Sequence, residues 1–197
     1  MFARFTAVLS AVLFLASPAL ARQSSLVEEV AQAIRTHTDR APASALIETG
    51  FSPEGNAERL VLKVINSSTK SVRLAAYSFT SPRVVRALID AKKRGVDVRV
   101  VADDSGAKSK AGSAALNLLV GANIPTRING EYAIHHDKYI IVDGRHVQTG
   151  SFNYSKAAAQ SNSENVIVIW HNSELAATYL RHWESRFGEA VDYKRAY

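Results

Sequence analysis

The chain has no cysteine among its 197 residues. This absence excludes disulfide bridges and also anchoring through a lipid-modified cysteine. It does not argue against export, because a domain of this size can be stable on its hydrophobic core alone, and 47% of the residues are hydrophobic. The same composition excludes an intrinsically disordered chain.

Long hydrophobic runs are also missing at the N-terminus. Residues 6–16 are apolar and follow Arg4, but this run is well short of the roughly 20 residues that span a bilayer. Ala19 and Ala21 then place small residues at the two positions before the cleavage site that a signal peptidase recognises. We therefore predict a secretory signal peptide over residues 1–21, cleaved after Ala21, rather than an uncleaved anchor. The mature protein is expected to be periplasmic or secreted.

Acidic residues are outnumbered by basic ones. The chain has 24 Lys and Arg against 18 Asp and Glu, a formal charge of +6. Removing residues 1–21 takes away only Arg4, which leaves 23 − 18 = +5. A positive charge suits a polyanionic substrate but does not establish one.

Helical and strand-like apolar patterns alternate along the chain. Residues 72–104 run as strand, helix and strand, which is a βαβ unit with strands apolar on both faces. We therefore predict an α/β fold in a single domain, with a mixed, largely parallel β-sheet flanked by helices on both faces. Expected helices lie at residues 24–40, 58–66, 82–89, 116–120 and 173–187, and expected strands at 45–48, 72–79, 96–102, 124–128, 139–142, 146–149 and 166–170.

A single short segment carries a concentrated set of polar residues. His136 and Lys138 directly precede an apolar strand, and Asp143-Gly144 after it is a strong hairpin signal. On an extended chain residues two apart share a face, so the imidazole and the ammonium are expected to share a site. The cation can hold a phosphate oxygen and disfavours the protonated imidazole, which suits attack on phosphorus. This segment therefore indicates phosphodiester cleavage.

The return strand of this hairpin adds neutral donors. Gly150 allows close backbone approach, and Ser151 and Asn153 can complete the grip on phosphate oxygens. An attacking imidazole needs its second nitrogen oriented, and Glu164 at the start of the last strand is the preferred carboxylate. Asp143 is the other acidic candidate, with a structural role at the turn as its alternative.

The competing interpretation of the segment is a metal site formed by His135, His136 and Asp137. We disfavour it because neighbouring residues on a strand point to opposite faces, and Lys138 would repel a cation beside His136. No metal or other cofactor is expected.

The pattern H-x-K-x4-D-x6-G-S-x-N, from His136 to Asn153, resembles the signature of the phospholipase D superfamily. Within it, the chain is most similar to small single-motif bacterial endonucleases that are exported and act as homodimers. The likeness also includes residues 76–81, 94–103 and 164–166, and covers roughly residues 51–187. We therefore expect residues 51–197 to form the catalytic domain. The apolar pattern places an N-terminal helix and first strand before it, in residues 22–50, and residues 22–197 are expected to be one folding unit.

The resemblance also implies residue roles. His136 would be the nucleophile that forms a phosphohistidine, and His136 of the partner subunit would protonate the leaving oxygen and then activate water. Lys138 and Asn153 would bind phosphate with support from Ser151, and Glu164 would orient the imidazole. The reaction of the family needs no metal.

The chain has no second His-x-Lys, since its other histidines are followed two places later by residues other than lysine. Transfer through histidine needs an acid opposite the nucleophile, because the leaving oxygen departs in line with attack. One chain cannot supply both groups, so we expect a homodimer with the site on its twofold axis. The expected activity is hydrolysis of DNA, with RNA as a second polymer and little sequence specificity. The alternatives are a phospholipase D-type phospholipid hydrolase and an inactive nucleic-acid-binding protein.

Overall fold

The computed structural model describes residues 46–195. The predicted signal peptide and the helix expected over residues 24–40 lie outside the described residues. Within residues 46–195, no helix combines the length and apolar character needed to cross a membrane.

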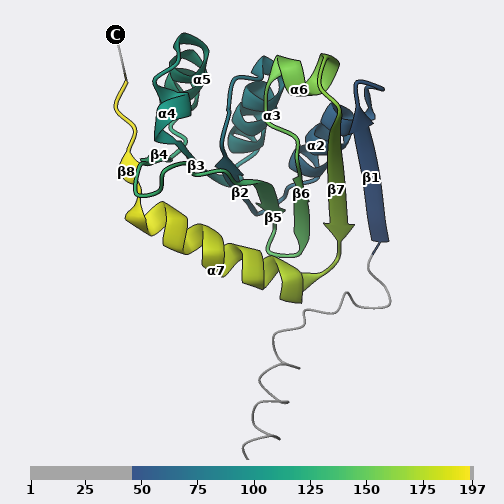
Figure 1. The fold of residues 1–197 in the computed structure, drawn as a ribbon. Coiled ribbons are helices and arrows are strands. Elements are labelled where there is room, and N and C mark those ends of the chain that lie inside the picture. Colours follow the sequence, from purple (N-terminus) through teal and green to yellow (C-terminus); the bar gives the residue numbers. More distant parts are fainter. Residues whose placement is uncertain (1–45, 196–197) are drawn as a thin grey trace, which may run out of the picture. The chain divides into compact units, whose positions relative to one another are not determined.

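A twisted open sheet forms the centre of the described chain, with strand order β1-β7-β6-β5-β2-β3-β4-β8 (Figure 1). The strands expected from the sequence are all present, and a short final strand joins them at one edge. Their bounds are β1 Leu46–Ser52, β2 Ser71–Ala76, β3 Asp97–Asp103, β4 Thr126–Asn129, β5 Lys138–Val142, β6 His146–Gly150, β7 Glu164–Trp170 and β8 Val191–Asp192.

The predicted mixed sheet is confirmed, but its predicted largely parallel character needs correction. Within residues 46–195, the pairs β2–β3 and β3–β4 are parallel, and the other five pairs are antiparallel. Helical crossovers produce the two parallel pairs, as the βαβ pattern predicts. The chain then reverses through the β5–β6 hairpin, and β7 and β1 add to it antiparallel. Periodicity identified the strands but carried no information on which neighbours they pair with.

Helices cover both faces of the sheet, as predicted (Figure 1). On one face, apolar side chains of α2, α3 and α5 form the larger core with residues of β2, β3 and β5. On the other face, Trp183 and Ala176 of α7 pack on alternate residues of the same strands, including Tyr139 and Ile141. The helices are α2 Asn56–Asn66, α3 Pro82–Lys93, α4 Asp104–Ala107, α5 Lys110–Gly121, α6 Lys156–Gln160 and α7 Ser173–Glu189.

The β5–β6 hairpin determines where the motif lies. All residues of β5 are buried, and Asp143 and Gly144 at the turn have φ of 55° and 63°, as a tight hairpin of this type requires. Pairing of Tyr139 with Thr149, and of Lys138 with Ala76 at the end of β2, aligns the strand ends. The start of β5, the end of β6 and the start of β7 therefore meet at one end of the sheet.

Candidate active site

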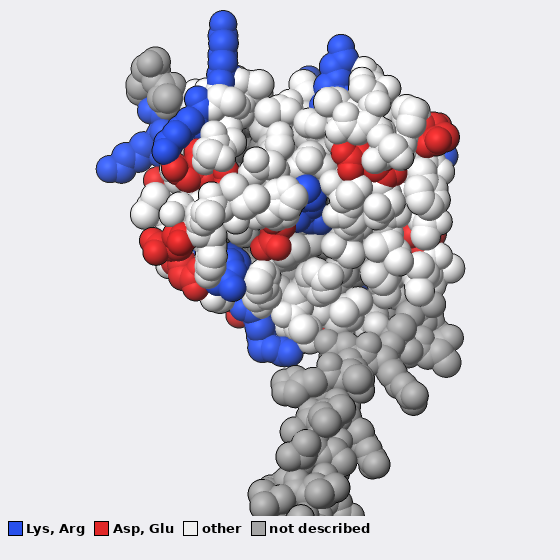
Figure 2. Space-filling view, viewed as in Figure 1, with Lys and Arg blue, Asp and Glu red and all other residues white. Residues whose placement is uncertain are grey.

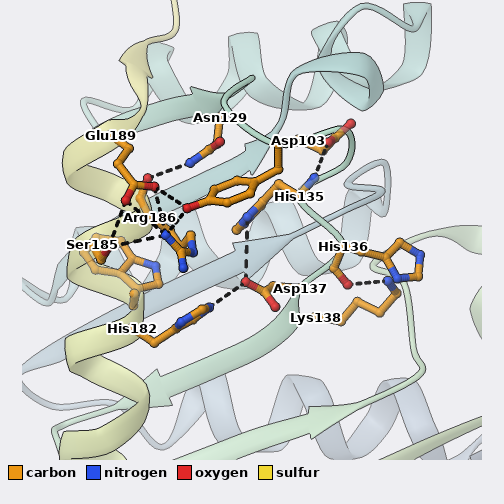
Figure 3. A network of polar contacts seen from close by, with 12 residues as sticks. Asp103, Asn129, His135, His136, Asp137, Lys138, His182, Ser185, Arg186 and Glu189 are labelled. Carbon is orange, nitrogen blue, oxygen red and sulfur yellow. Dashed lines mark hydrogen bonds and ion pairs between the residues drawn. The ribbon is translucent and has the colours of Figure 1, made fainter.

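His136 and Lys138 lie together at that end of the sheet, as their spacing predicted. Lys138 is 8% exposed and its Nζ donates to the backbone oxygen of His136 at 2.8 Å (Figure 3). Tyr77, just beyond β2, touches both side chains. Its ring centroid lies 4.6 Å from that of His136 and 5.0 Å from Lys138 Nζ. Since the His136 side chain is exposed, this arrangement presents an accessible imidazole beside a largely buried cation.

Asp137 and His135 point to the opposite face, toward α7 (Figure 3). Asp137 Oδ2 lies 3.1 Å from His182 Nε2 and 3.7 Å from His135 Nδ1. The backbone N–H of His135 donates to Asp103 Oδ2 at 2.7 Å. His135 and His136 therefore do not converge on one point, and residues 46–195 contain no cluster of three or more metal-ligating side chains.

Ser151 and Glu164 are joined directly. Ser151 Oγ donates to Glu164 Oε2 at 2.5 Å, and Asn162 Nδ2 donates to Glu164 Oε1 at 2.9 Å. Ser151 Oγ in turn accepts from the backbone N–H of Asn165 at 3.1 Å. These contacts anchor the segment after β6 to the start of β7.

Gly150 makes this junction possible. Its φ is 147°, and a Cβ at this position would lie 2.2 Å from the backbone oxygen of Asn165. Only glycine allows the two backbones to approach so closely. The close approach expected at Gly150 is therefore present, although the neighbour is strand β7.

Asn153 reaches the same end of the sheet from the loop that follows β6. Its Oδ1 lies 3.5 Å from the backbone nitrogen of Ser78, and the adjacent Tyr154 forms a bridge with Phe79. Asn153 therefore lies against the segment that carries Tyr77. The structure thus brings His136, Lys138, Ser151, Asn153 and Glu164 to one end of the sheet, where the sequence predicted a phosphate site.

The charge of Lys138 depends on two carboxylates. Burial lowers the pKa of Lys138, whereas the charges of Asp137 and Glu164 raise it and so oppose this effect. Keeping this ammonium protonated matters because only the charged form binds a phosphate oxygen strongly. Glu164 forms hydrogen bonds with Ser151 and Asn162. Within residues 46–195 it therefore fixes Ser151 and raises the pKa of Lys138, and neither of these hydrogen bonds involves the His136 ring.

The structure does not support a catalytic role for Asp143. This residue follows the last residue of β5, at the opposite end of the strand from Lys138. Its carboxylate accepts from the backbone N–H groups of Thr69, Lys70 and Ser71 and from the Thr69 hydroxyl, at 2.7 to 3.2 Å. Asp143 therefore holds the turn before β2 against the hairpin.

Sequence reasoning missed Tyr77 and His182 as neighbours of the motif. Tyr77 lies in a segment that resembles the family, but nothing local indicated contact with His136. His182 is 45 positions from Asp137 and has no partner pattern of its own. Both contacts join helices, strands or loops that lie far apart in the sequence, so they follow from the tertiary packing and not from any local pattern.

A cavity of about 450 Å³ opens beside His136 and Lys138 and extends toward α7. Tyr139, Thr149 and Gly150 line it from the sheet, and Thr178, Tyr179 and His182 line it from α7. The reactive pair therefore borders a space large enough for part of a substrate.

Known proteins are similar to this chain in sequence and in fold. The family model for the cardiolipin synthase, phospholipase D-like domain matches residues 61–187. "Phospholipase D" of Rickettsia bellii is 39% identical over 140 residues, which are 71% of this chain and 68% of the relative. "Mitochondrial cardiolipin hydrolase" of Danio rerio is 34% identical over 182 residues, 90% of this chain and 74% of the relative.

Among solved structures, Nuc from Salmonella typhimurium, a phospholipase D family member, superposes with a TM-score of 0.76. It is 47% identical in sequence, and the match covers 77% of this chain and 99% of that one. The family resemblance expected from His136, Lys138 and Asn153 is confirmed. The chain belongs to the phospholipase D superfamily and is a phosphodiesterase of that superfamily.

Proposed function

We propose that this phosphodiesterase is an exported endonuclease that hydrolyses DNA, and RNA as a second polymer, with little sequence specificity and without a metal. The observation that carries the proposal is the exposed imidazole of His136 beside the buried ammonium of Lys138, in a chain with a single copy of the motif. The charge of +5 on the proposed mature chain, residues 22–197, and the resemblance to small single-motif endonucleases favour nucleic acid over lipid.

The reaction follows in two balanced steps. In the first, a ring nitrogen of His136 bonds to phosphorus, the ester P–O bond breaks, and the leaving oxygen takes a proton from a second imidazole. In the second, water gives a proton to that imidazole, its oxygen bonds to phosphorus, and the P–N bond breaks. Lys138 and Asn153 hold the non-bridging oxygens while negative charge develops on them. Both imidazoles return to their starting state.

The need for a second imidazole in the reaction supports a homodimer. Within residues 46–195, His135 and His182 lie toward α7, and both contact the carboxylate of Asp137, at 3.7 and 3.1 Å. These two imidazoles are therefore engaged with Asp137, whereas the His136 ring lies against Tyr77. We therefore propose that His136 of a second copy of this chain provides the acid, which places the site on a twofold axis.

A phospholipid hydrolase is the second candidate. The names of the relatives in Rickettsia bellii and Danio rerio favour it. So do Tyr132 and Ile134, which are 41% and 49% exposed just before the motif. Figure 2 shows Lys and Arg interspersed with acidic side chains on one face rather than gathered in a continuous stripe, so charge alone does not choose between the substrates.

The deciding experiment uses mature protein in chelator with double-stranded DNA, single-stranded DNA, RNA, phosphatidylcholine and cardiolipin. We expect cleavage of the nucleic acids, and loss of cleavage in His136→Ala. A matched control is His171→Asn, because His171 is an exposed histidine beyond the far end of β7 and asparagine tolerates its positive φ of 58°. Loss of all activity in chelator would refute the metal-free mechanism, and turnover of lipid alone would establish the second candidate.

A separate experiment tests the shared site. Heterodimers of wild-type chain and His136→Ala chain, isolated through two different affinity tags, should be inactive because each reaction needs both imidazoles. Heterodimers with half the wild-type activity would mean that each chain works alone.

A further inference from the structure

We propose that the cavity between the start of β5 and α7 binds the nucleobase next to the scissile phosphate. This inference rests on the proposed nuclease function. His136 and Lys138 form part of the cavity lining, so a group bound there adjoins the phosphate that they hold. In a nucleic acid the base is joined to that phosphate through one sugar, which places it within reach of such a neighbouring space.

The walls of the cavity suit a flat ring. Tyr139 of β5 and Tyr179 of α7 meet edge to face with ring centroids 5.0 Å apart, and the ring of His182 lies 6.0 Å from that of Tyr139. Aromatic side chains bind bases of any sequence because every base has a π-face. This matches a nuclease of little sequence preference.

One buried polar group in this wall lacks a partner. Tyr139 is 3% exposed, and its hydroxyl forms no hydrogen bond with any group in residues 46–195. A buried hydroxyl without a partner is costly, so such a group in a native structure needs an explanation, and binding of a ligand group is one. The hydroxyl is closed off from solvent in this structure, so a ring nitrogen or carbonyl oxygen of a base accepts a hydrogen bond from it once the side chains of the cavity wall shift.

The cavity also carries an acceptor. Asp137 lines it, and His182 Nε2 at 3.1 Å from Oδ2 holds this carboxylate in place. A carboxylate accepts from the amino groups of bases, as it does from cytosine in DNA recognition. The volume of about 450 Å³ accommodates a base and its sugar.

The test uses a labelled single-stranded oligonucleotide with one phosphodiester among methylphosphonate linkages. The nucleotide on either side of that phosphodiester is a normal thymidine or an abasic analogue. For wild-type protein, removing the base on one side should lower kcat/KM by about tenfold, since stacking of one base contributes about that much or more. Equal cleavage of all these substrates would overturn the inference while leaving the nuclease function intact.

Two variants connect this effect to the cavity. Tyr179→Ala should raise KM for the normal substrate about tenfold and remove the difference between normal and abasic substrates. Tyr139→Phe removes only the unpartnered hydroxyl, so it should raise KM, leave kcat unchanged and keep or raise the Tm. Glu184→Ala, at an exposed position on α7 outside the cavity, is the control and should behave as wild type.

Other outcomes distinguish a failure of the base-binding proposal from a failure of the proposed nuclease function. If Tyr139→Phe and Tyr179→Ala leave KM and the abasic difference unchanged, the base lies elsewhere and the inference is wrong. If wild-type protein leaves every oligonucleotide intact but hydrolyses phosphatidylcholine, the proposed function itself fails. Impaired lipid hydrolysis in Tyr179→Ala would then assign the cavity to a lipid headgroup.

Discussion

Replacing Asp143 should reduce stability and leave the chemistry intact. Its carboxylate accepts from three backbone N–H groups and one hydroxyl at residues 69–71. A hydrogen bond contributes about 0.5–1.5 kcal/mol net, and solvent compensates part of this because Thr69 and Lys70 are exposed. We therefore expect Asp143→Ala to lower the free energy of unfolding by about 2–3 kcal/mol, or the Tm by about 5–10 °C in a protein of this size.

Asp143→Asn is the matched variant. Asparagine tolerates the φ of 55° at this turn and keeps one acceptor oxygen, whereas alanine adds backbone strain. The asparagine variant should therefore lose about half as much stability as the alanine variant. Urea unfolding of both variants, followed by circular dichroism, measures the loss.

The stability that the protein loses when Asp143 is replaced should depend on pH. Burial alone would raise the pKa of Asp143, but the hydrogen bonds from Ser71, Thr69 and Lys70 outweigh burial and lower it. A carboxylate whose pKa is lower in the folded protein stabilises it above the unfolded-state pKa, and this contribution disappears as the pH falls through the folded-state pKa. The difference between wild type and Asp143→Asn should therefore be full at neutral pH and shrink in acid.

Activity measurements decide between the two roles of this residue. Folded Asp143→Asn should retain the kcat of wild type on a phosphodiester substrate. A variant with unchanged unfolding midpoint and abolished turnover would refute the structural role and restore the catalytic one.

Two further predictions concern the site itself. Asp137→Asn and Glu164→Gln each remove a charge that raises the pKa of Lys138, so the alkaline limb of kcat/KM should move to lower pH in both; a pH–rate profile that coincides with wild type would contradict this role. Gly150→Ala should introduce about 1–3 kcal/mol of backbone strain and force the strand away from Asn165, with lower turnover as a result. Thermal unfolding and kinetics of this variant measure both effects, and wild-type values for each would show that the close approach is not needed.

The β5–β6 hairpin shows how much local pattern can predict. The apolar run 139–142 followed by Asp143-Gly144 predicted a strand, a tight turn and a return strand, and all three are present. The shared face of His136 and Lys138 followed from their spacing of two on an extended chain. Both predictions succeeded because they depend only on the backbone within a few residues.

Predictions that needed distant partners fared less well. The sheet is less parallel than expected because β7 and β1 pair antiparallel beside β6, and no periodicity reports such neighbours. Asp143 was a catalytic candidate until its partners at residues 69–71 placed it at the wrong end of β5. Glu164 was expected to orient an imidazole; within residues 46–195 its hydrogen bonds run to Ser151 and Asn162, and the orienting role stays a prediction for the assembled dimer.

The sequence by itself determined the family, the candidate reacting residues and the hairpin that carries them, because motif spacing, strand period and turn chemistry are properties of neighbouring residues. Only the tertiary structure decided what surrounds them. Tyr77 against His136, His182 against Asp137, and the cavity lined by Tyr139 and Tyr179 arise where β2, β5 and α7 meet. Such contacts depend on how elements far apart in the chain pack together, and that packing is set by burial across the whole sheet rather than by any local pattern.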